Sequence, residues 1–371
     1  MAFSFSFAGD DIEDDDQSLT SPPPQSQTLS KPAAASSSGA GAFPVQGKPL
    51  LPPASHDFTQ MISRLPSKIA FSLLNVDLQD GSTIQIPRRE LWDVRVQLMA
   101  EDDADGPSES EAGLGEHDVK TGIYEGGFKS WESSVDLVKV LALENSADAL
   151  NRGPCVVIEL GCGTALPSLV LFQWALAERK SGPKNPLVLA VSDYNPSVLY
   201  LVTLPNIILA WALQLRGQLP VLGEAFTADG ELELTPEVLQ AFQDSLTSRQ
   251  ISFSFLSGAW SPEFVDLLYS SAFAPSLGAN AKTLVLGSET IYSPFALECF
   301  SSTLLSILQR EHQERPSGNA RAIIAAKRLY FGVGGSLDDF VDKMRGLGTT
   351  VDTLFEEPTG VARGVVGCQL C

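Results

Sequence analysis

The chain has 371 residues and a formal net charge of −20, from 45 acidic and 25 basic side chains. This balance disfavours binding to a nucleic-acid backbone, which needs a basic surface, so we expect no direct nucleic-acid partner. Three histidines in polar stretches and five cysteines without framework spacing also argue against a His-ligated zinc enzyme, a Ser-His-Asp hydrolase and a disulfide scaffold.

Residues 1–60 hold a run of acids followed by proline, serine and alanine tracts. Such a composition buries too little apolar surface to offset chain ordering, so it predicts a disordered acidic tail. The N-terminus lacks the basic region of a signal peptide, and we find no apolar run of about 18 residues that would span a membrane. Together with cysteines that are expected to be reduced, these features predict a cytoplasmic or nuclear protein without a membrane partner.

Two further segments precede the main domain. Residues 61–100 alternate apolar and polar side chains around a D-G turn at Asp80 and predict a small β extension. Residues 101–119 are rich in acids and contain no Lys or Arg, so they predict a mobile acidic insertion.

Strand-like and helix-like segments alternate from residue 120 to residue 371, which is the pattern of a doubly wound parallel sheet. The last two strand-like runs, 350–357 and 364–370, leave no room for a crossover helix, so the final strand should pair antiparallel. We therefore expect an α/β fold with a Rossmann-like, seven-stranded mixed sheet. The first expected elements are a helix at Trp131–Leu143, a strand at Cys155–Leu160, a helix near 166–178, a strand at 186–195, and an apolar helix at 198–215 that is kinked or split near Pro205.

The segment VVIELGCGTALPS at 156–168 raises the question of which ligand the glycine turn holds. A dinucleotide fingerprint needs a third glycine where Leu166 stands, and no phosphate-loop motif occurs. Glu159, directly before the turn, would be unwelcome beside a phosphate but suits a cationic or zwitterionic ligand.

Three later strands also end in groups that suit a nucleoside. Asp193 stands where a carboxylate accepts bonds from ribose hydroxyls, Trp260 offers an aromatic face, and the SETIY segment begins at Ser288. Ligands of open α/β sheets bind at the carboxyl ends of the strands. These strand ends together favour S-adenosylmethionine over a dinucleotide.

The chain resembles the seven-strand, class I S-adenosylmethionine-dependent methyltransferases, and more closely the fungal-type histidine protein methyltransferases that modify a ribosomal protein. The resemblance covers about residues 120–340. It rests on the segments GGFKSWESSVDLV, VIELGCGTALPSL, SDYNPSVLYLVTLPN, SGAW, SETIY and AAKRLYFGVGG, in that order. The resemblance implies methyl transfer to a histidine imidazole, a basic protein substrate, no metal and a monomer.

The resemblance also implies roles for particular residues. Those expected to contact the cofactor are Lys129, Ser130, Trp131, Glu132, Ser133, Glu159, Gly161, Gly163, Asp193, Tyr194, Asn195, Gly258, Ala259, Trp260 and Ser288. Those expected on the acceptor side are Glu289, Tyr292 and Asn195, any of which could accept the N–H of a neutral imidazole. We interpret the glycine cluster at 332–335 as a flexible, substrate-facing loop.

Three alternatives remain open at this stage. A lysine methyltransferase of the same branch would share fold and cofactor but would need a deprotonated ammonium as the acceptor. A non-enzymatic escort of a basic ribosomal protein would use the acidic tail. An NAD-dependent oxidoreductase is disfavoured by Leu166.

Overall fold

The computed structural model describes residues 44, 46–47, 49–105, 127–179, 185–272, 277–317, 319–358 and 360–371. All of them belong to one contact unit, Gly39–Cys371. Most of the predicted acidic tail, and the acidic insertion beyond residue 105, lie outside the described residues.

The main sheet contains eight strands among the described residues, in the order β1-β7-β5-β4-β8-β9-β11-β10. The strands from β7 to β9 are parallel, and β1, β11 and β10 pair antiparallel with their neighbours. The predicted seven-stranded mixed sheet is confirmed, with β1 added at one edge. The bounds are β1 Ala54–His56, β4 Cys155–Leu160, β5 Leu187–Asp193, β7 Ile251–Ser257, β8 Lys282–Ser288, β9 Ala320–Lys327, β10 Thr349–Glu357 and β11 Arg363–Leu370.

The central strand β4 shows why the sheet is covered on both faces. All six of its residues are buried. Cys155 and Val157 belong to one apolar cluster, whereas Val156, Ile158 and Leu160 belong to the other. Successive strand residues point to opposite faces, so a continuous apolar run requires a helix layer on each side.

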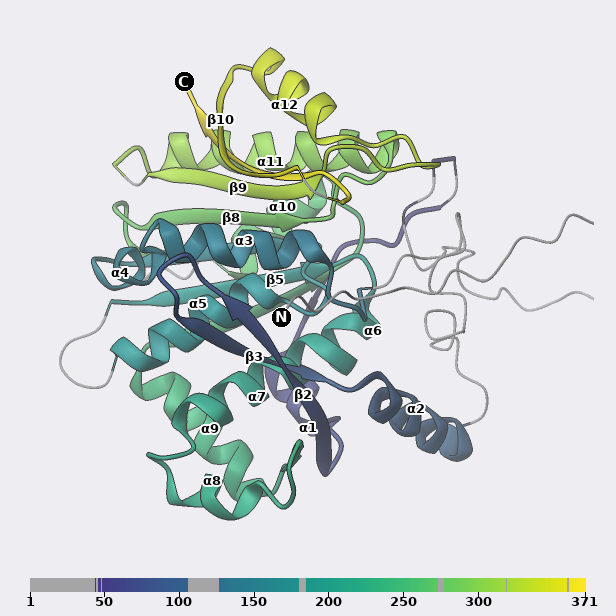
Figure 1. Ribbon diagram of the computed structural model, residues 1–371, viewed down its shortest axis with the longest axis vertical. Helices are drawn as coiled ribbons and strands as arrows, with labels where there is room; N and C mark the ends of the chain where they lie inside the picture. Colours follow the sequence, from purple (N-terminus) through teal and green to yellow (C-terminus); the bar gives the residue numbers. More distant parts are fainter. Residues whose placement is uncertain are drawn as a thin grey trace, which may run out of the picture. The chain divides into compact units, whose positions relative to one another are not determined.

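Helices form these two layers (Figure 1). The helices of the first cluster include α3, α5, α7 and α9, and those of the second include α10, α11 and α12. Ser261 caps α10 by accepting the Phe264 N–H at 3.3 Å, as its position before Pro262 predicts. The bounds are α3 Glu132–Leu143, α4 Ser146–Asn151, α5 Leu166–Glu178, α7 Leu204–Leu215, α9 Pro236–Ser248, α10 Pro262–Ser271, α11 Pro294–Glu314 and α12 Leu337–Gly346.

The helix expected to be kinked or split near Pro205 changes its hydrogen-bond pattern there. A short α6, Pro196–Val198, continues into a π-helical turn, Leu199–Thr203, and then into α7. Proline lacks an N–H, so a wider turn immediately before it avoids an unmade helical bond. By length and hydropathy the segment Pro196–Leu215 could span a membrane, which corrects our sequence expectation, but 89% of its most apolar window is buried inside the protein.

The N-terminal extension combines strands and helices. The D-G turn joins β2, Lys68–Asp77, to β3, Thr83–Arg89, as predicted. The same small sheet takes in β6, Glu231–Glu233. The sequence predicted only β structure before residue 100, whereas Leu91–Asp105 forms helix α2 and takes in the first residues of the expected acidic insertion.

One further difference concerns the end of the predicted disordered tail. Residues 54–56 form β1 and Phe58–Ser63 forms α1, so the prediction of disorder does not hold there, because pairing with β7 supplies hydrogen bonds that local composition does not reveal. Asp57 caps α1 by accepting the Gln60 N–H at 2.8 Å. Between α7 and β7 the chain forms α8, Pro220–Ala225, followed by β6 and α9.

Candidate active site

The glycine turn after β4 has the sharp backbone that its sequence predicts. Gly161, Gly163 and Ala165 have φ values of 68°, 51° and 59°. A Cβ atom on Gly161 would stand 2.8 Å from Cγ2 of Thr290, so the turn also needs glycine for space. The backbone therefore approaches the segment after β8 closely at this point.

Asp193 ends β5 and links three parts of the site. Its Oδ2 accepts the N–H of Gly163 at 3.1 Å, and its Oδ1 accepts the N–H of Asn195 at 3.0 Å. Burial raises the pKa of Asp193 to about 6, although the backbone donors oppose this. Each carboxylate oxygen keeps a second lone pair with which it can accept a ligand hydroxyl.

A segment ahead of β1 forms another wall of the site. The N–H of Leu51 donates to the hydroxyl of Tyr194 at 3.0 Å, and the N–H of Ala259 donates to the carbonyl of Leu51 at 2.9 Å. Gly258 has φ 101°, and a Cβ there would lie 2.4 Å from the carbonyl oxygen of Pro52. The glycine of SGAW thus makes room for the N-terminal segment.

The segment that leads into α3 contributes further groups to the site. The hydroxyls of Ser130 and Thr164 are 3.0 Å apart, which ties this segment to the glycine turn. Nζ of Lys327 lies 5.0 Å from the ring centroid of Trp131, within range of a cation–π contact. Trp131 is therefore held by a cation at the end of β9.

Glu289 follows β8 in a left-handed conformation, with φ 56°. Its Oε1 accepts the hydroxyl of Ser133 at 2.5 Å, and its Oε2 accepts the hydroxyl of Tyr330 at 2.5 Å. Burial raises the pKa of Glu289, while the ammonium of Lys327 and the two hydroxyls oppose the rise. A non-glycine residue at positive φ is costly, so this geometry depends on its surroundings.

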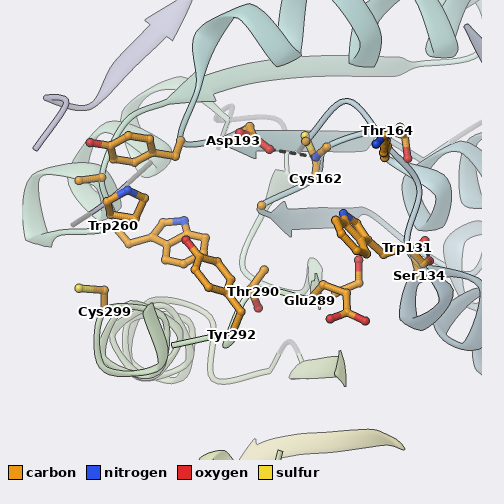
Figure 2. A pocket seen from close by; sticks show the side chains of 18 of the residues that line it. Trp131, Ser134, Cys162, Thr164, Asp193, Trp260, Glu289, Thr290, Tyr292 and Cys299 are labelled. Atoms are coloured by element: carbon orange, nitrogen blue, oxygen red, sulfur yellow. Dashed lines mark hydrogen bonds between the residues drawn. The ribbon is translucent and has the colours of Figure 1, made fainter. Parts of the chain in front are cut away.

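These groups line one pocket, and Figure 2 shows side chains from several strand ends facing it. Its empty volume is about 880 Å³, including space open to solvent, which is the size of a small-molecule site. The lining consists of Pro44, Leu50, Gly127, Lys129, Trp131, Ser134, Gly161, Cys162, Gly163, Thr164, Asp193, Tyr194, Ala259, Trp260, Ser288, Glu289, Thr290, Tyr292 and Cys299.

The structure thus brings most of the candidate residues together. Those that line the pocket are Lys129, Trp131, Gly161, Gly163, Asp193, Tyr194, Ala259, Trp260, Ser288, Glu289 and Tyr292. The candidates outside the lining are Ser130, Glu132, Ser133, Glu159, Asn195 and Gly258. Three of these six, Ser130, Ser133 and Asn195, form hydrogen bonds to the lining residues Thr164, Glu289 and Asp193.

The side chains of two candidates outside the lining, Glu159 and Asn195, accept backbone N–H groups at the start of a helix. Glu159 is fully buried beneath the turn, where its Oε2 accepts the N–H of Ser168 at 3.0 Å in the first turn of α5. Burial raises the pKa of Glu159 to about 7. Oδ1 of Asn195 accepts the N–H of Ser197 at 2.9 Å and caps α6.

Sequence reasoning missed several lining residues. Cys162, Thr164 and Thr290 lie inside motifs already singled out, so their position beside the glycines and Glu289 was an available signal. Cys299 comes from α11, and Leu50 from the segment ahead of β1, where no local pattern points to a pocket. Burial raises the pKa of Cys162 well above its usual value, so its thiol stays protonated.

The pocket suits S-adenosylmethionine better than a dinucleotide. Its described lining holds a single cationic side chain, Lys129, beside the carboxyl groups of Asp193 and Glu289, so a pyrophosphate would meet more negative than positive charge. Tyr194 and Trp260 supply aromatic surface for an adenine. Within the described part of the chain, no cluster of three His, Cys, Asp or Glu side chains is placed to hold a metal ion.

The chain is similar to two yeast proteins and, more distantly, to a solved structure. No family model matches the chain. It is 39% identical over 265 residues to histidine protein methyltransferase 1 of Saccharomyces cerevisiae, covering 68% of this chain and 67% of that protein. It is 34% identical over 294 residues to histidine protein methyltransferase 1 of Schizosaccharomyces pombe, covering 79% and 77%. Among solved structures, the N-terminal domain of human METTL16 in complex with SAH shares 10% identity at a TM-score of 0.39, covering 85% and 95%.

Proposed function

The chain belongs to the histidine protein methyltransferase family, and on this premise we propose that it methylates an imidazole nitrogen of a histidine in a ribosomal protein. The family makes it an S-adenosylmethionine-dependent protein methyltransferase. One geometric observation carries the proposal. A single pocket joins Asp193, at the end of β5, to Glu289, beyond the end of β8, so a nucleoside and an acceptor group can occupy it together.

We assign the cofactor end of the pocket to four side chains. S-adenosylmethionine supplies a methyl group that its sulfonium makes electrophilic. Asp193 would accept the ribose hydroxyls, and Tyr194 and Trp260 would enclose the adenine. Lys129, in the segment ahead of α3, would pair with the methionine carboxylate.

We assign the acceptor end to Glu289 and Tyr292. A neutral imidazole offers a lone pair on one nitrogen while the other nitrogen keeps its proton. Glu289 is suited to accept that N–H, because each of its oxygens retains a lone pair beyond the bonds from Ser133 and Tyr330. Asn195 is less suited, because it does not line the pocket. Positioning of this kind is the main demand of the reaction.

The charge of the chain supports a basic protein as the substrate. With a net charge of −20, the protein attracts a cationic partner over distance and repels a nucleic-acid backbone. Ribosomal proteins are basic. Their opposite charge and the family membership of this chain are the two grounds on which we propose a ribosomal protein as the substrate. We keep cytoplasm and nucleus as the expected locations and a monomer as the expected state.

The proposal is tested with ribosomal proteins from cells that lack this chain. Purified protein and labelled S-adenosylmethionine should label a single band, and Asp193→Ala should abolish the labelling. An escort without enzyme activity would bind the ribosomal protein equally well with either variant and would label nothing. That result would overturn the proposal.

A further inference from the structure

We propose that Tyr330 is a positioning residue of the acceptor site, whose hydroxyl fixes the carboxylate of Glu289 at the pocket wall, ready to receive an imidazole N–H. The inference rests on the proposed function, because it gives Glu289 an acceptor to orient. Tyr330 itself does not line the pocket. It acts through Glu289.

The tyrosine hydroxyl forms a bridge with two bonds. It donates to Oε2 of Glu289 at 2.5 Å and accepts the backbone N–H of Lys327 at 3.4 Å. The ring is buried, so the hydroxyl has little freedom to turn elsewhere. Ser133 holds the other carboxylate oxygen, also at 2.5 Å. The carboxylate is thereby fixed at both ends, from α3 and from the end of β9.

The backbone around Tyr330 is built to support the segment after β8. The N–H of Tyr330 donates to the carbonyl of Gly335 at 2.9 Å, and the N–H of Gly335 donates to the carbonyl of Tyr292 at 3.1 Å. A Cβ on Gly335 would lie 2.1 Å from the carbonyl oxygen of Ile291. We expected the glycine cluster at 332–335 to be a flexible loop. Instead, Gly335 packs closely against the segment that carries Glu289 and Tyr292 and forms a hydrogen bond to it.

The backbone of Glu289 needs such support. Its φ of 56° is unfavourable for a residue with a side chain. Its N–H donates to the carbonyl of Ala325 in β9 at 3.0 Å. Both the main chain and the side chain of Glu289 are therefore held from β9 and the residues that follow it.

The Tyr330 hydroxyl is one of several groups that set the pKa of Glu289. Burial and the nearby Glu132 on α3 raise the pKa of Glu289, whereas Lys327 on β9 and the hydroxyls of Ser133 and Tyr330 lower it. Removing the Tyr330 hydroxyl should raise the pKa of Glu289 further. A protonated Glu289 has lost the charge that attracts an imidazole N–H, so the acidic limb of the pH–rate profile should move to higher pH.

The test is Tyr330→Phe in the full chain. We expect affinity for S-adenosylhomocysteine and the KM of the substrate to stay within about twofold, and kcat to fall by about tenfold. The acidic limb should shift upward by about half a pH unit or more. Ser133→Ala, which removes the other donor, should shift the limb in the same direction and serves if Tyr330→Phe folds poorly.

Tyr269→Phe is the matched control. Tyr269 also donates to a buried glutamate, Glu311, at 2.6 Å, but between α10 and α11 and outside the pocket lining. It should lower thermal stability while leaving the pH profile in place. An unchanged kcat and an unchanged acidic limb in Tyr330→Phe would overturn the inference.

A second readout separates this inference from the proposed function. Carbon-13 labelling of glutamate carboxyl groups allows the Glu289 signal to be assigned by its loss in Glu289→Gln and titrated without any substrate. Tyr330→Phe should raise the pKa of that signal; an identical titration in wild type and variant contradicts the inference. Absence of histidine methylation by wild type would instead contradict the proposed function.

Discussion

Thr203 donates a 2.7 Å hydrogen bond from Oγ1 to the carbonyl oxygen of Gly163, tying the π-helical turn to the glycine turn of the pocket. Asn206 makes a parallel tie, because its Nδ2 donates to the carbonyl of Thr164 at 3.1 Å. Its Oδ1 accepts the N–H of Arg89 at 2.7 Å, so the β extension reaches the same turn. The VTLPN segment, residues 202–206, therefore holds the glycine turn in place through the side chains of Thr203 and Asn206.

The first prediction concerns this support. Thr203→Val should destabilise the protein by about 1–3 kcal/mol, because the buried carbonyl of Gly163 loses its donor. It should also weaken binding of S-adenosylhomocysteine severalfold, since the turn is no longer fixed. Denaturant unfolding and calorimetric titration measure the two effects.

Thr247→Val is the matched control for that change. The Thr247 hydroxyl donates to a backbone carbonyl, that of Gln243, at 3.0 Å, on an exposed stretch of α9. It should change stability by less than about 0.5 kcal/mol and leave binding intact. Equal effects of the two substitutions would contradict a special role for Thr203.

The second prediction concerns the pH dependence of stability. The folded pKa of Glu159, about 7, lies above its ordinary value of 4.5, so the folded state holds a proton that the unfolded state has released. The free energy of unfolding should therefore fall as pH rises from about 4.5 to about 7, by at most about 1.4 kcal/mol per pH unit from this group. Glu159→Gln should flatten the slope in urea unfolding measured across that range; a variant with the wild-type slope would contradict the assignment.

The third prediction concerns Asp193 and ligand affinity. With a pKa of about 6, Asp193 becomes neutral as pH falls and accepts ribose hydroxyls less well. Affinity for S-adenosylhomocysteine should weaken below pH 6 and level off above about pH 7. Asp193→Asn should bind at least about tenfold more weakly at high pH and show little pH dependence. A wild-type affinity that is constant down to about pH 5 would exclude this role.

The fourth prediction concerns the close packing of Gly335, after β9, against Ile291 and Tyr292, after β8. Gly335→Ala should cost about 1–3 kcal/mol of stability, because its Cβ would overlap the carbonyl of Ile291 and force the backbone apart. Methyl transfer should fall more than cofactor binding. Gly346→Ala, at the end of α12 with nothing within 4 Å of the added Cβ, should leave both near wild type.

The sequence predicts the central sheet well, because a strand that is buried on both faces appears in the sequence as a continuous apolar run. The apolar run Cys155–Leu160 matches β4 to the residue, and Leu166–Glu178 matches α5. Helix α2 was missed because the alternation in its first residues also fits a strand, and so short a pattern does not distinguish the two. Helix α9 was missed although Thr235 followed by Pro236 is a helix-start signal; Oγ1 of Thr235 accepts the N–H of Val238 at 3.3 Å.

Parts of the site could not be predicted because they depend on contacts between distant segments. The bond from Leu51 to Tyr194 joins residues 143 positions apart, and that from Tyr330 to Glu289 spans 41. Residues that line the pocket at strand ends follow from the topology, since parallel strands end at one edge. Residues that hold those side chains from behind leave no periodic trace in the sequence.

The most direct test of the central claim is the chemical identity of the methylated residue. Ribosomal protein labelled by wild-type chain is digested, and the labelled peptide is sequenced and hydrolysed to amino acids. The account predicts methylhistidine at a single position, absent when Asp193→Ala is used. Methyllysine with unmodified histidine would contradict the histidine acceptor and place the activity with the lysine-modifying branch of the same fold.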